Sequence, residues 1–330
     1  MSNHNVNQPL RPSISGYILT EELYSGRRTS VYRALAAPET QTSPVVIKFL
    51  RGSKAAGRLS AHPSFNELVR FRNQFIIAQK LASPGIVTPL TLELWNHSYA
   101  LVMEDVKGLG LWNYLQTHGH LSITQVIEIA IQLADTLHHL SQHRVLHKDI
   151  NPANILIQPD THQIWLTDFS LASLLPKESQ ELQSPRTLEG TLAYMAPEQT
   201  GRMNRSIDYR ADFYSLGVTL YELLVGALPF QSSDPMELIH CHIAKAPVPP
   251  CELNPSLPRP LSDIILKLMA KNAEERYQSA LGLKYDLQQC LSQREASGEI
   301  EPFELGQRDV CDRFLIPEKL YGRADEIQTL

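Results

Sequence analysis

Three oxygen-bearing side chains in the middle of the chain have the types and spacing needed to act on a phosphoryl group. Asp149 and Asn154 belong to the run HKDINPAN at positions 147–154, and Asp168 follows in the triplet TDF at 167–169. Asp149 can accept or orient the proton of an attacking hydroxyl, while Asn154 and Asp168 offer hard oxygen ligands to Mg²⁺. A single triplet of this kind would more simply cap a turn, so the argument depends on the ordered set.

A lysine on a β-branched segment is the matching cation. Lys48 ends the run VVIK at positions 45–48, whose composition predicts a strand. Taken alone, such a lysine is more simply a solvated strand residue. Its position ahead of a predicted helix and of the 147–154 run favours a functional role over a solvated one.

The elements that must position these groups can be predicted from the spacing of apolar residues. Short β-like segments lie around Val31–Arg33 and Val45–Leu50, and a helix is expected over Phe65–Leu81. The run from Tyr99 to Val106 is typical of a buried strand, and the Lys-Gly pair after it is a natural hinge. These patterns predict a small part of the molecule that is built on a sheet with one helix.

Beyond this hinge, the pattern becomes helical. Between Thr124 and His143, apolar residues recur every three or four positions, which marks the buried face of a long helix. Further helices are expected over 214–224, 261–270 and 280–291, with a proline-dense connection at 247–260. The predicted fold class is therefore α+β, with a β-rich part followed by a larger helical part.

Composition and charge limit the classes of protein to consider. The chain has 330 residues, of which 43% are hydrophobic and 20% charged, so it can bury a sizeable core. A net charge of −5 argues against broad binding to nucleic acid or to an anionic membrane. The four widely spaced cysteines, the polar start and the lack of a long apolar run favour a cytoplasmic protein without a membrane span.

The same motifs, taken together, resemble a known family. HKD at 147–149, DFS at 168–170 and APE at 196–198 stand in the order of the protein kinase signature set, and the match is to the Ser/Thr type. The resemblance implies a two-lobed kinase fold over residues 17–290, with an N-lobe at about 17–105 and a C-lobe at about 108–290. It also implies transfer of the γ-phosphoryl group of Mg-ATP to a protein hydroxyl.

The resemblance also assigns roles to individual residues. Asp149, Lys48 and Asn154 are the expected catalytic residues, and Asn154 and Asp168 are the expected ligands of Mg²⁺. Lys48 would hold the α- and β-phosphates, and the hinge would offer backbone groups to adenine. The residues expected to bind ATP besides Lys48 are Leu23, Gly26, Val31, Val46, Glu104, Val106 and Leu156.

Several positions depart from the family pattern. Gln74 stands where a helix glutamate is expected, Asn151 where a lysine is usual, and Ser170 where the third motif residue is glycine. The phosphate loop keeps only Gly26 of three glycines, with tyrosine and threonine at 24 and 29. These departures leave a second hypothesis open, in which the chain is a pseudokinase that acts as a nucleotide-binding scaffold.

The segment from 168 to 198 resembles a kinase activation segment. Thr191 is expected near the catalytic aspartate, and Asp212 is expected to hold the catalytic loop through backbone hydrogen bonds. Glu198 and Arg276 resemble the buried ion pair of the family. The candidates for a regulatory phosphate are Ser173, Ser179, Ser184 and Thr187, with Thr187 preferred.

A narrower resemblance concerns HKDINP and residues 189–205, which look like one bacterial subfamily. In that subfamily a Ser/Thr kinase domain precedes an ATPase module, a GAF sensor module and a histidine kinase. Residues 314–330 resemble the start of such an ATPase module. The expectation is an input or regulatory module of a larger signalling protein, with those modules and a protein substrate as partners. Residues 1–16 are expected to be flexible, and 291–330 to be a linker and stub without a fold of its own.

Overall fold

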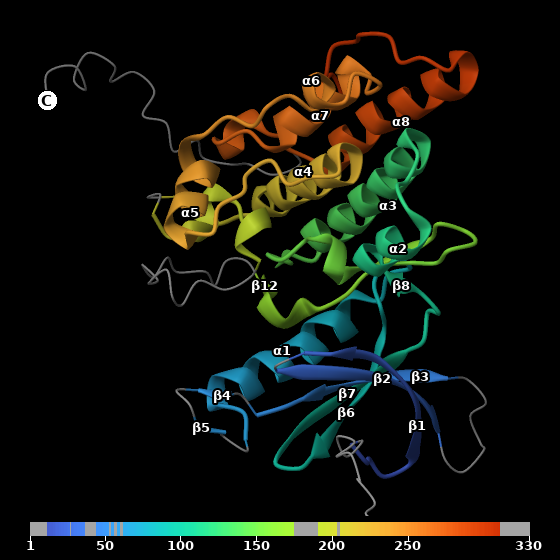
Figure 1. Ribbon diagram of the computed structural model, residues 1–330, viewed down its shortest axis with the longest axis vertical. Helices are drawn as coiled ribbons and strands as arrows, with labels where there is room; N and C mark the ends of the chain where they lie inside the picture. The colour runs from blue at the N-terminus through green and yellow to red at the C-terminus, as the bar shows by residue number, and fades with distance from the viewer. Residues whose placement is uncertain are drawn as a thin grey trace, which may run out of the picture.

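The computed structural model describes residues 12–26, 28–36, 44–52, 54–55, 58–59, 62–174, 191–202 and 205–310. Figure 1 shows two lobes, a sheet with helix α1 at the bottom and a larger helical body above it. The predicted α+β, two-lobed fold class is confirmed.

The N-lobe is built on a five-stranded antiparallel sheet with the order β1-β2-β3-β7-β6. In this sheet Lys48 pairs with Val31 on one side and with Leu101 on the other, so it lies on the central strand. The strands are β1 (Tyr17–Ser25), β2 (Thr29–Ala36), β3 (Val45–Leu50), β6 (Pro89–Trp95) and β7 (Ser98–Glu104), with the short pair β4 (Lys54–Ala55) and β5 (Arg58–Leu59) beside them.

Helix α1 (Phe65–Leu81) has the bounds predicted from the sequence. It begins with a capping box, in which the Ser64 side chain accepts from the backbone of Glu67 and the Glu67 carboxylate accepts from the backbone of Ser64. Its buried face consists of Phe71, Gln74, Ile77, Ala78 and Leu81. Gln74 is the polar member of this face, so it must find a partner in the interior.

The C-lobe is mainly helical, as expected. The apolar positions predicted for the face of α3, such as Val126, Leu133 and Leu140, are all buried. The α-helices are α2 (Leu111–His118), α3 (Ile123–Gln142), α4 (Arg210–Val225), α5 (Pro235–Ala244), α6 (Pro250–Leu253), α7 (Arg259–Leu268) and α8 (Ala280–Ser297). The short strands are β8 (Leu109–Gly110), β9 (Val145–Leu146), β10 (Ile155–Ile157), β11 (Ile164–Leu166) and β12 (Ser173–Leu174). The 3₁₀ turns are η1 (Pro152–Asn154), η2 (Phe169–Leu171), η3 (Leu192–Tyr194), η4 (Pro197–Thr200) and η5 (Ala273–Glu275).

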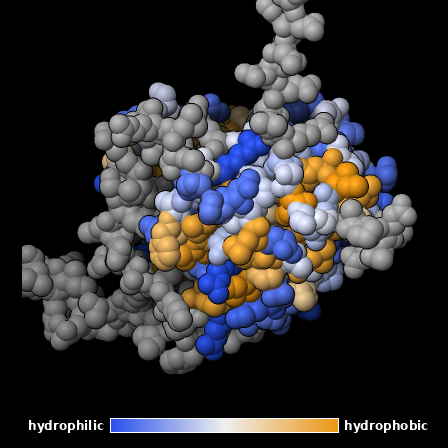
Figure 2. All heavy atoms as spheres, turned by 90° about the horizontal axis from the view of Figure 1, so that it is seen from below, coloured by the Kyte–Doolittle hydropathy of each residue, from blue (hydrophilic) through white to orange (hydrophobic). Residues whose placement is uncertain are grey.

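Seen from the N-lobe end, apolar patches alternate with hydrophilic ones (Figure 2). The strands of this lobe carry exposed apolar side chains at Ile18, Leu35, Leu90 and Leu94. Such single exposed residues are usual on a sheet with one solvated face. Among the helices that the structure describes, none is both long and apolar enough to cross a bilayer.

Both ends of the described chain have more structure than was expected from the sequence, which predicted a flexible start and a tail without a fold. Near the start, the backbone carbonyl of Ser13 accepts a hydrogen bond from the Trp95 indole at 3.0 Å, although the sheet itself begins at Tyr17. Near the end, α8 continues to Ser297 and Ile300 is buried, so the expectation that the chain from 291 has no fold of its own is wrong through residue 310. This segment is folded because the side chains of Ile300, Phe303 and Leu305, which are unevenly spaced, pack against the C-lobe core. Residues 311–330 lie outside the described part.

The expected ion pair between Glu198 and Arg276 lies in the C-lobe interior. The Arg276 guanidinium approaches the two carboxylate oxygens at 2.6 and 2.8 Å, and both residues are almost fully buried. Arg276 also donates to the carbonyl oxygens of Arg210 and Ala270, both at 2.8 Å. A bidentate pair with these further acceptors ties η4 to the turn that precedes α8.

Replacing Arg276 by Met should lower the free energy of unfolding by about 3–5 kcal/mol, because Glu198 would remain buried without its counter-charge. Urea unfolding measures this change. Lys284→Met is a matched control, since the Lys284–Asp135 pair has similar length but lies at the surface, where its loss should cost less than about 1 kcal/mol. Equal effects of the two variants would contradict the buried-pair interpretation.

Candidate active site

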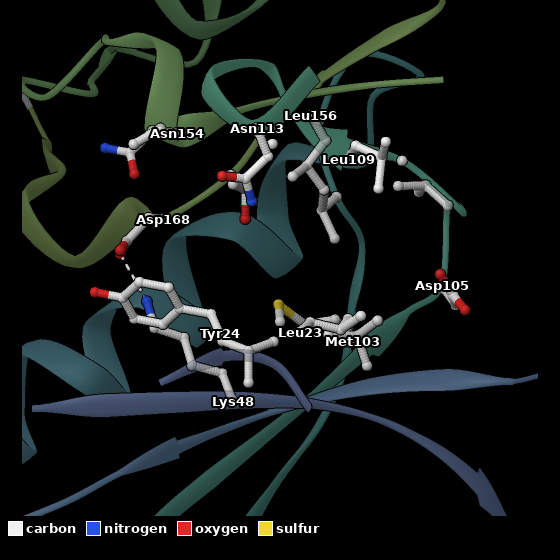
Figure 3. Close-up of a pocket in the computed structure, with 18 of the residues that line it drawn as sticks. Leu23, Tyr24, Lys48, Met103, Asp105, Leu109, Asn113, Asn154, Leu156 and Asp168 are labelled. Atoms are coloured by element: carbon white, nitrogen blue, oxygen red, sulfur yellow. Dashed lines mark ion pairs between the residues drawn. The ribbon is translucent and has the colours of Figure 1, made fainter. Parts of the chain in front are cut away.

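A cavity of about 320 Å³ lies between the lobes, with walls from the sheet, the hinge after β7 and the C-lobe (Figure 3). Its size suits a small ligand. Two predicted residues that the structure describes, Gly26 and Asp149, are not part of its wall. The predicted residues that line it are Leu23, Val31, Val46, Lys48, Glu104, Val106, Asn154, Leu156 and Asp168.

Lys48 connects the two lobes at the inner end of this cavity. Its Nζ lies 2.9 Å from Oδ1 of Asp168, which follows β11 in the C-lobe. The same Nζ donates to Oε1 of Gln74 at 3.4 Å and lies 5.9 Å from the centre of the Phe71 ring. The predicted lysine is therefore a buried cation with a carboxylate and an amide as partners.

The charge state of Asp168 is set by two opposing effects. Burial alone would raise the pKa of its carboxyl, but the Lys48 ammonium outweighs this through its charge and a hydrogen bond, so the pKa lies below its usual value. The backbone of Asp168 is left-handed, with φ 63° and ψ 70°. This uncommon conformation turns its side chain back to accept from the amide of Ser170 at 3.3 Å.

Ser170 fits its position without the freedom of a glycine. It lies inside η2, a right-handed turn, while the left-handed residue of the motif is Asp168. Phe169 beside it is buried and packs edge-on against His147, with ring centres 4.8 Å apart. The departure at position 170 therefore does not disturb this arrangement of the loop.

A hydrogen-bond cluster holds the Asp149 carboxylate beside the cavity. Asn154 donates from Nδ2 to the backbone oxygen of Asp149 at 2.8 Å and to its Oδ2 at 2.9 Å. Asn151 donates to Oδ1 at 3.1 Å, and the backbone amide of Thr191 donates to the same oxygen at 3.0 Å. Asn151, which lacks the lysine charge, thus orients the carboxylate.

Asp212 holds this loop through backbone hydrogen bonds, as predicted. Its two carboxylate oxygens accept from the backbone amides of His147 and Lys148 at 2.8 and 2.7 Å. Burial raises the pKa of the Asp212 carboxyl, and these two amides limit the rise. His147 accepts from the Asp149 amide through Nδ1, so its Nε2 donates to the Thr167 carbonyl at 3.0 Å and joins the loop to β11.

Tyr24 is a wall residue that the sequence-based prediction did not assign to the cavity. Its side chain lies at the end of the cavity that Lys48 and Asp168 form (Figure 3). A Cβ at position 26 would lie 2.4 Å from the Tyr24 hydroxyl, so the ring in this position packs directly against Gly26. Gly26, which was expected to bind ATP, lies next to the Tyr24 ring and outside the cavity wall, and its contact with a nucleotide stays a prediction. The other unassigned wall residues include Thr29, Met103 and Asn113.

The activation segment is described only in part. Thr191 lies next to Asp149, as expected, and Ser173 belongs to β12, which pairs with β9. The other three candidates for a regulatory phosphate, at 179, 184 and 187, lie outside the described residues.

Comparison with known proteins agrees with this geometry. The family model described as protein kinase domain matches residues 17–291. The chain belongs to the protein kinase family. This kinase domain is 33% identical over 247 residues to serine/threonine-protein kinase PknB of Mycobacterium tuberculosis, which covers 74% of the chain and 38% of that relative. It is 31% identical over 276 residues to serine/threonine-protein kinase PrkC of Bacillus subtilis, and this match covers 83% of the chain and 40% of that relative. The chain thus matches about two-fifths of the length of these relatives.

Replacing Lys48 by Met should raise the pKa of the Asp168 carboxyl, because burial then acts without the opposing ammonium. Carbon-13 NMR of labelled aspartate over a pH series measures the shift, with Lys48→Arg as the control that keeps the charge. In the wild-type kinase domain the lowered pKa contributes stability above the unfolded value of about 3.9, and this contribution is lost as pH falls through the folded pKa. An unchanged Asp168 titration in Lys48→Met would contradict the pairing.

Proposed function

We propose that this kinase domain transfers the γ-phosphoryl group of Mg-ATP to a serine or threonine hydroxyl of a protein. The observation that carries the proposal is the Lys48–Asp168 ion pair of 2.9 Å, which lines the same cavity as Asn154. One cation and two oxygen donors thus face one space, and Asp149 is held at its edge. This combination supplies the electrostatic positioning on which phosphoryl transfer depends.

The cavity offers an apolar slot for adenine and a polar end for phosphates. Leu23, Val31 and Val46 supply the N-lobe side of the slot, and Leu156 on β10 supplies the C-lobe side. The backbone at Glu104 and Val106, at the hinge, would hydrogen-bond the adenine edge. Lys48 at the inner end would then hold the α- and β-phosphates.

The donor set fits Mg²⁺ that is shared with the nucleotide. Asn154 uses its Nδ2 on Asp149, which leaves its oxygen for a ligand, and in Figure 3 that oxygen points toward the Asp168 side of the cavity. In the described part of the chain no group of three His, Cys, Asp or Glu side chains could hold a metal alone. Mg²⁺ commonly takes one or two protein oxygens and completes its shell with phosphates and water. When bound, it would neutralise charge on the phosphate oxygens.

Asp149 is placed to handle the proton of the acceptor. Its Oδ1 receives hydrogen bonds from Asn151 and Thr191 and its Oδ2 from Asn154, so the carboxylate is fixed. In the transfer, the substrate oxygen forms a bond to the γ-phosphorus as the bond to the ADP oxygen breaks. The hydroxyl proton passes to Asp149, and ADP leaves.

The pseudokinase alternative is less well supported, because the three residues that depart from the family pattern, at 74, 151 and 170, are compatible with the arrangement of the catalytic groups. Gln74 still contacts Lys48, Asn151 orients Asp149, and Ser170 fits a right-handed turn. From the resemblance of residues 189–205 and 314–330, we further propose that this domain is an input or regulatory module. Its partners would then be the ATPase, GAF and histidine kinase modules of the same polypeptide.

Asp149→Asn should lower the rate of phosphoryl transfer by about 10²–10⁴-fold, because the amide cannot take the proton. Purified protein is incubated with labelled Mg-ATP and a casein-like or basic protein, and label in protein is counted. Asp160→Asn, an exposed residue away from the cavity, is the matched control and should match wild type. ATP-induced thermal stabilisation with no transfer by the wild type, including with its partner modules, would instead favour the scaffold.

Gln74→Glu should raise kcat/KM for ATP by about fivefold. A neutral hydrogen bond contributes about 0.5–1.5 kcal/mol and a charge-assisted one about 1.5–3, so the carboxylate would hold Lys48 more firmly. Gln74→Leu removes the contact and should lower the same constant. Steady-state kinetics at varied ATP measures both variants, and equal values for all three proteins would show that α1 does not act through this contact.

A further inference from the structure

The chain after α8 returns along that helix as an ordered segment, residues 299–310, which we call the strap (Figure 1). The backbone amide of Glu301 donates to Gln293 at 2.7 Å, and that of Gly306 donates to Asp286 at 2.8 Å. The strap therefore runs antiparallel to α8, from its end back to its beginning. It lies beyond residue 291, where the kinase family match ends.

The strap is anchored by apolar burial along its length. Ile300 is 7% exposed, and Phe303 and Leu305 pack against the main core of the C-lobe. Asp286, which accepts from Gly306, has no exposed surface and also accepts from the Tyr277 hydroxyl at 2.6 Å. The strap thus completes the surroundings of a buried carboxylate.

Asp309 in the strap makes three hydrogen bonds to the two residues that precede α8. Its carboxylate accepts from the backbone amides of Gln278 and Ser279 at 2.7 and 2.8 Å, and from the Ser279 hydroxyl at 2.9 Å. These amides precede a helix start, where backbone donors lack helical partners and negative charge is favoured. Ser279 caps α8 by accepting from the Gly282 amide, and the Asp309 carboxylate in turn holds Ser279 in place.

Gly282 leaves room for this contact because it has no side chain. A Cβ at this position would lie 2.6 Å from Cα of Asp309 and 2.4 Å from its Oδ1. Gly282 lies in the first turn of α8, where glycine is less favourable than alanine and no left-handed backbone requires it. The close approach of the strap is what explains a glycine here.

The residues that Asp309 holds belong to the turn that anchors the activation segment. Gln278 accepts from Arg210 at 2.9 Å and donates from its side chain to the carbonyl of Arg276 at 2.8 Å. Arg276 in turn pairs with Glu198. We propose that the strap is a functional part of the kinase domain. It holds the residues at the start of α8 in place, as a clamp, and it thereby keeps the turn that contains Arg276 in the position that supports the activation segment.

The test uses Gly282→Ala and Asp309→Asn in the full chain. If the strap is clamped, the alanine methyl displaces it, so the urea midpoint falls and the amides of Gln278 and Ser279 exchange with deuterium at least tenfold faster. Asp309→Asn should also speed their exchange by removing the charge. Gln288→Ala, an exposed change on the same helix, is the control and should behave as wild type. A higher midpoint for Gly282→Ala with unchanged exchange would overturn the clamp.

A second measurement addresses the activation segment and rests on the proposed function. Both variants should transfer phosphate severalfold more slowly than wild type. Faster exchange at 278 and 279 with an unchanged transfer rate would overturn the coupling to Arg276. A wild-type chain that transfers no phosphate at all would count against the proposed function, while the exchange and midpoint results would still decide the clamp.

Discussion

The contact between Lys48 and Asp168 is the constraint around which the rest of the site is arranged. An ammonium buried on the central strand of the N-lobe would be costly without a counter-charge, and the carboxylate comes from the other lobe. The pair therefore fixes how closely β3 and η2 approach each other across the cavity. Gln74 adds a neutral contact from α1, so the helix, the sheet and the C-lobe loop meet at one nitrogen atom.

The C-lobe holds the other carboxylate of the proposed transfer, Asp149, through a chain of hydrogen bonds. Asp212 in α4 holds two consecutive amides of the 147–154 loop, and Asn154 and Asn151 then hold Asp149. Each step is a hydrogen bond from a buried or partly buried group whose alternative would be an unsatisfied polar atom. The carboxylate that would take the proton therefore has little freedom to turn away from the cavity.

Local patterns were sufficient to predict α1 and the buried face of α3, while the resemblance to the kinase family supplied nine of the residues that line the cavity. They could not predict the position of Tyr24. Strict alternation from Leu23 would direct the next side chain to the opposite face of β1, but the strand has an irregular register between Glu22 and Tyr24. Tyr24 pairs directly with Val31, so both reach the cavity side. A bulge depends on the partner strand and leaves no periodic signal.

The strap illustrates the same limit over a longer range. Its anchors at 300, 303 and 305 are too few and too unevenly spaced to indicate an element, and the contacts of Asp309 depend on a turn about thirty residues earlier. Gly282 carried a signal, since a glycine in the first turn of a helix without a left-handed backbone needs a close neighbour to explain it. Position 170 shows the converse, because Ser170 lies in a right-handed turn where no glycine is needed. Loss of a glycine from a motif therefore does not by itself indicate loss of the activity.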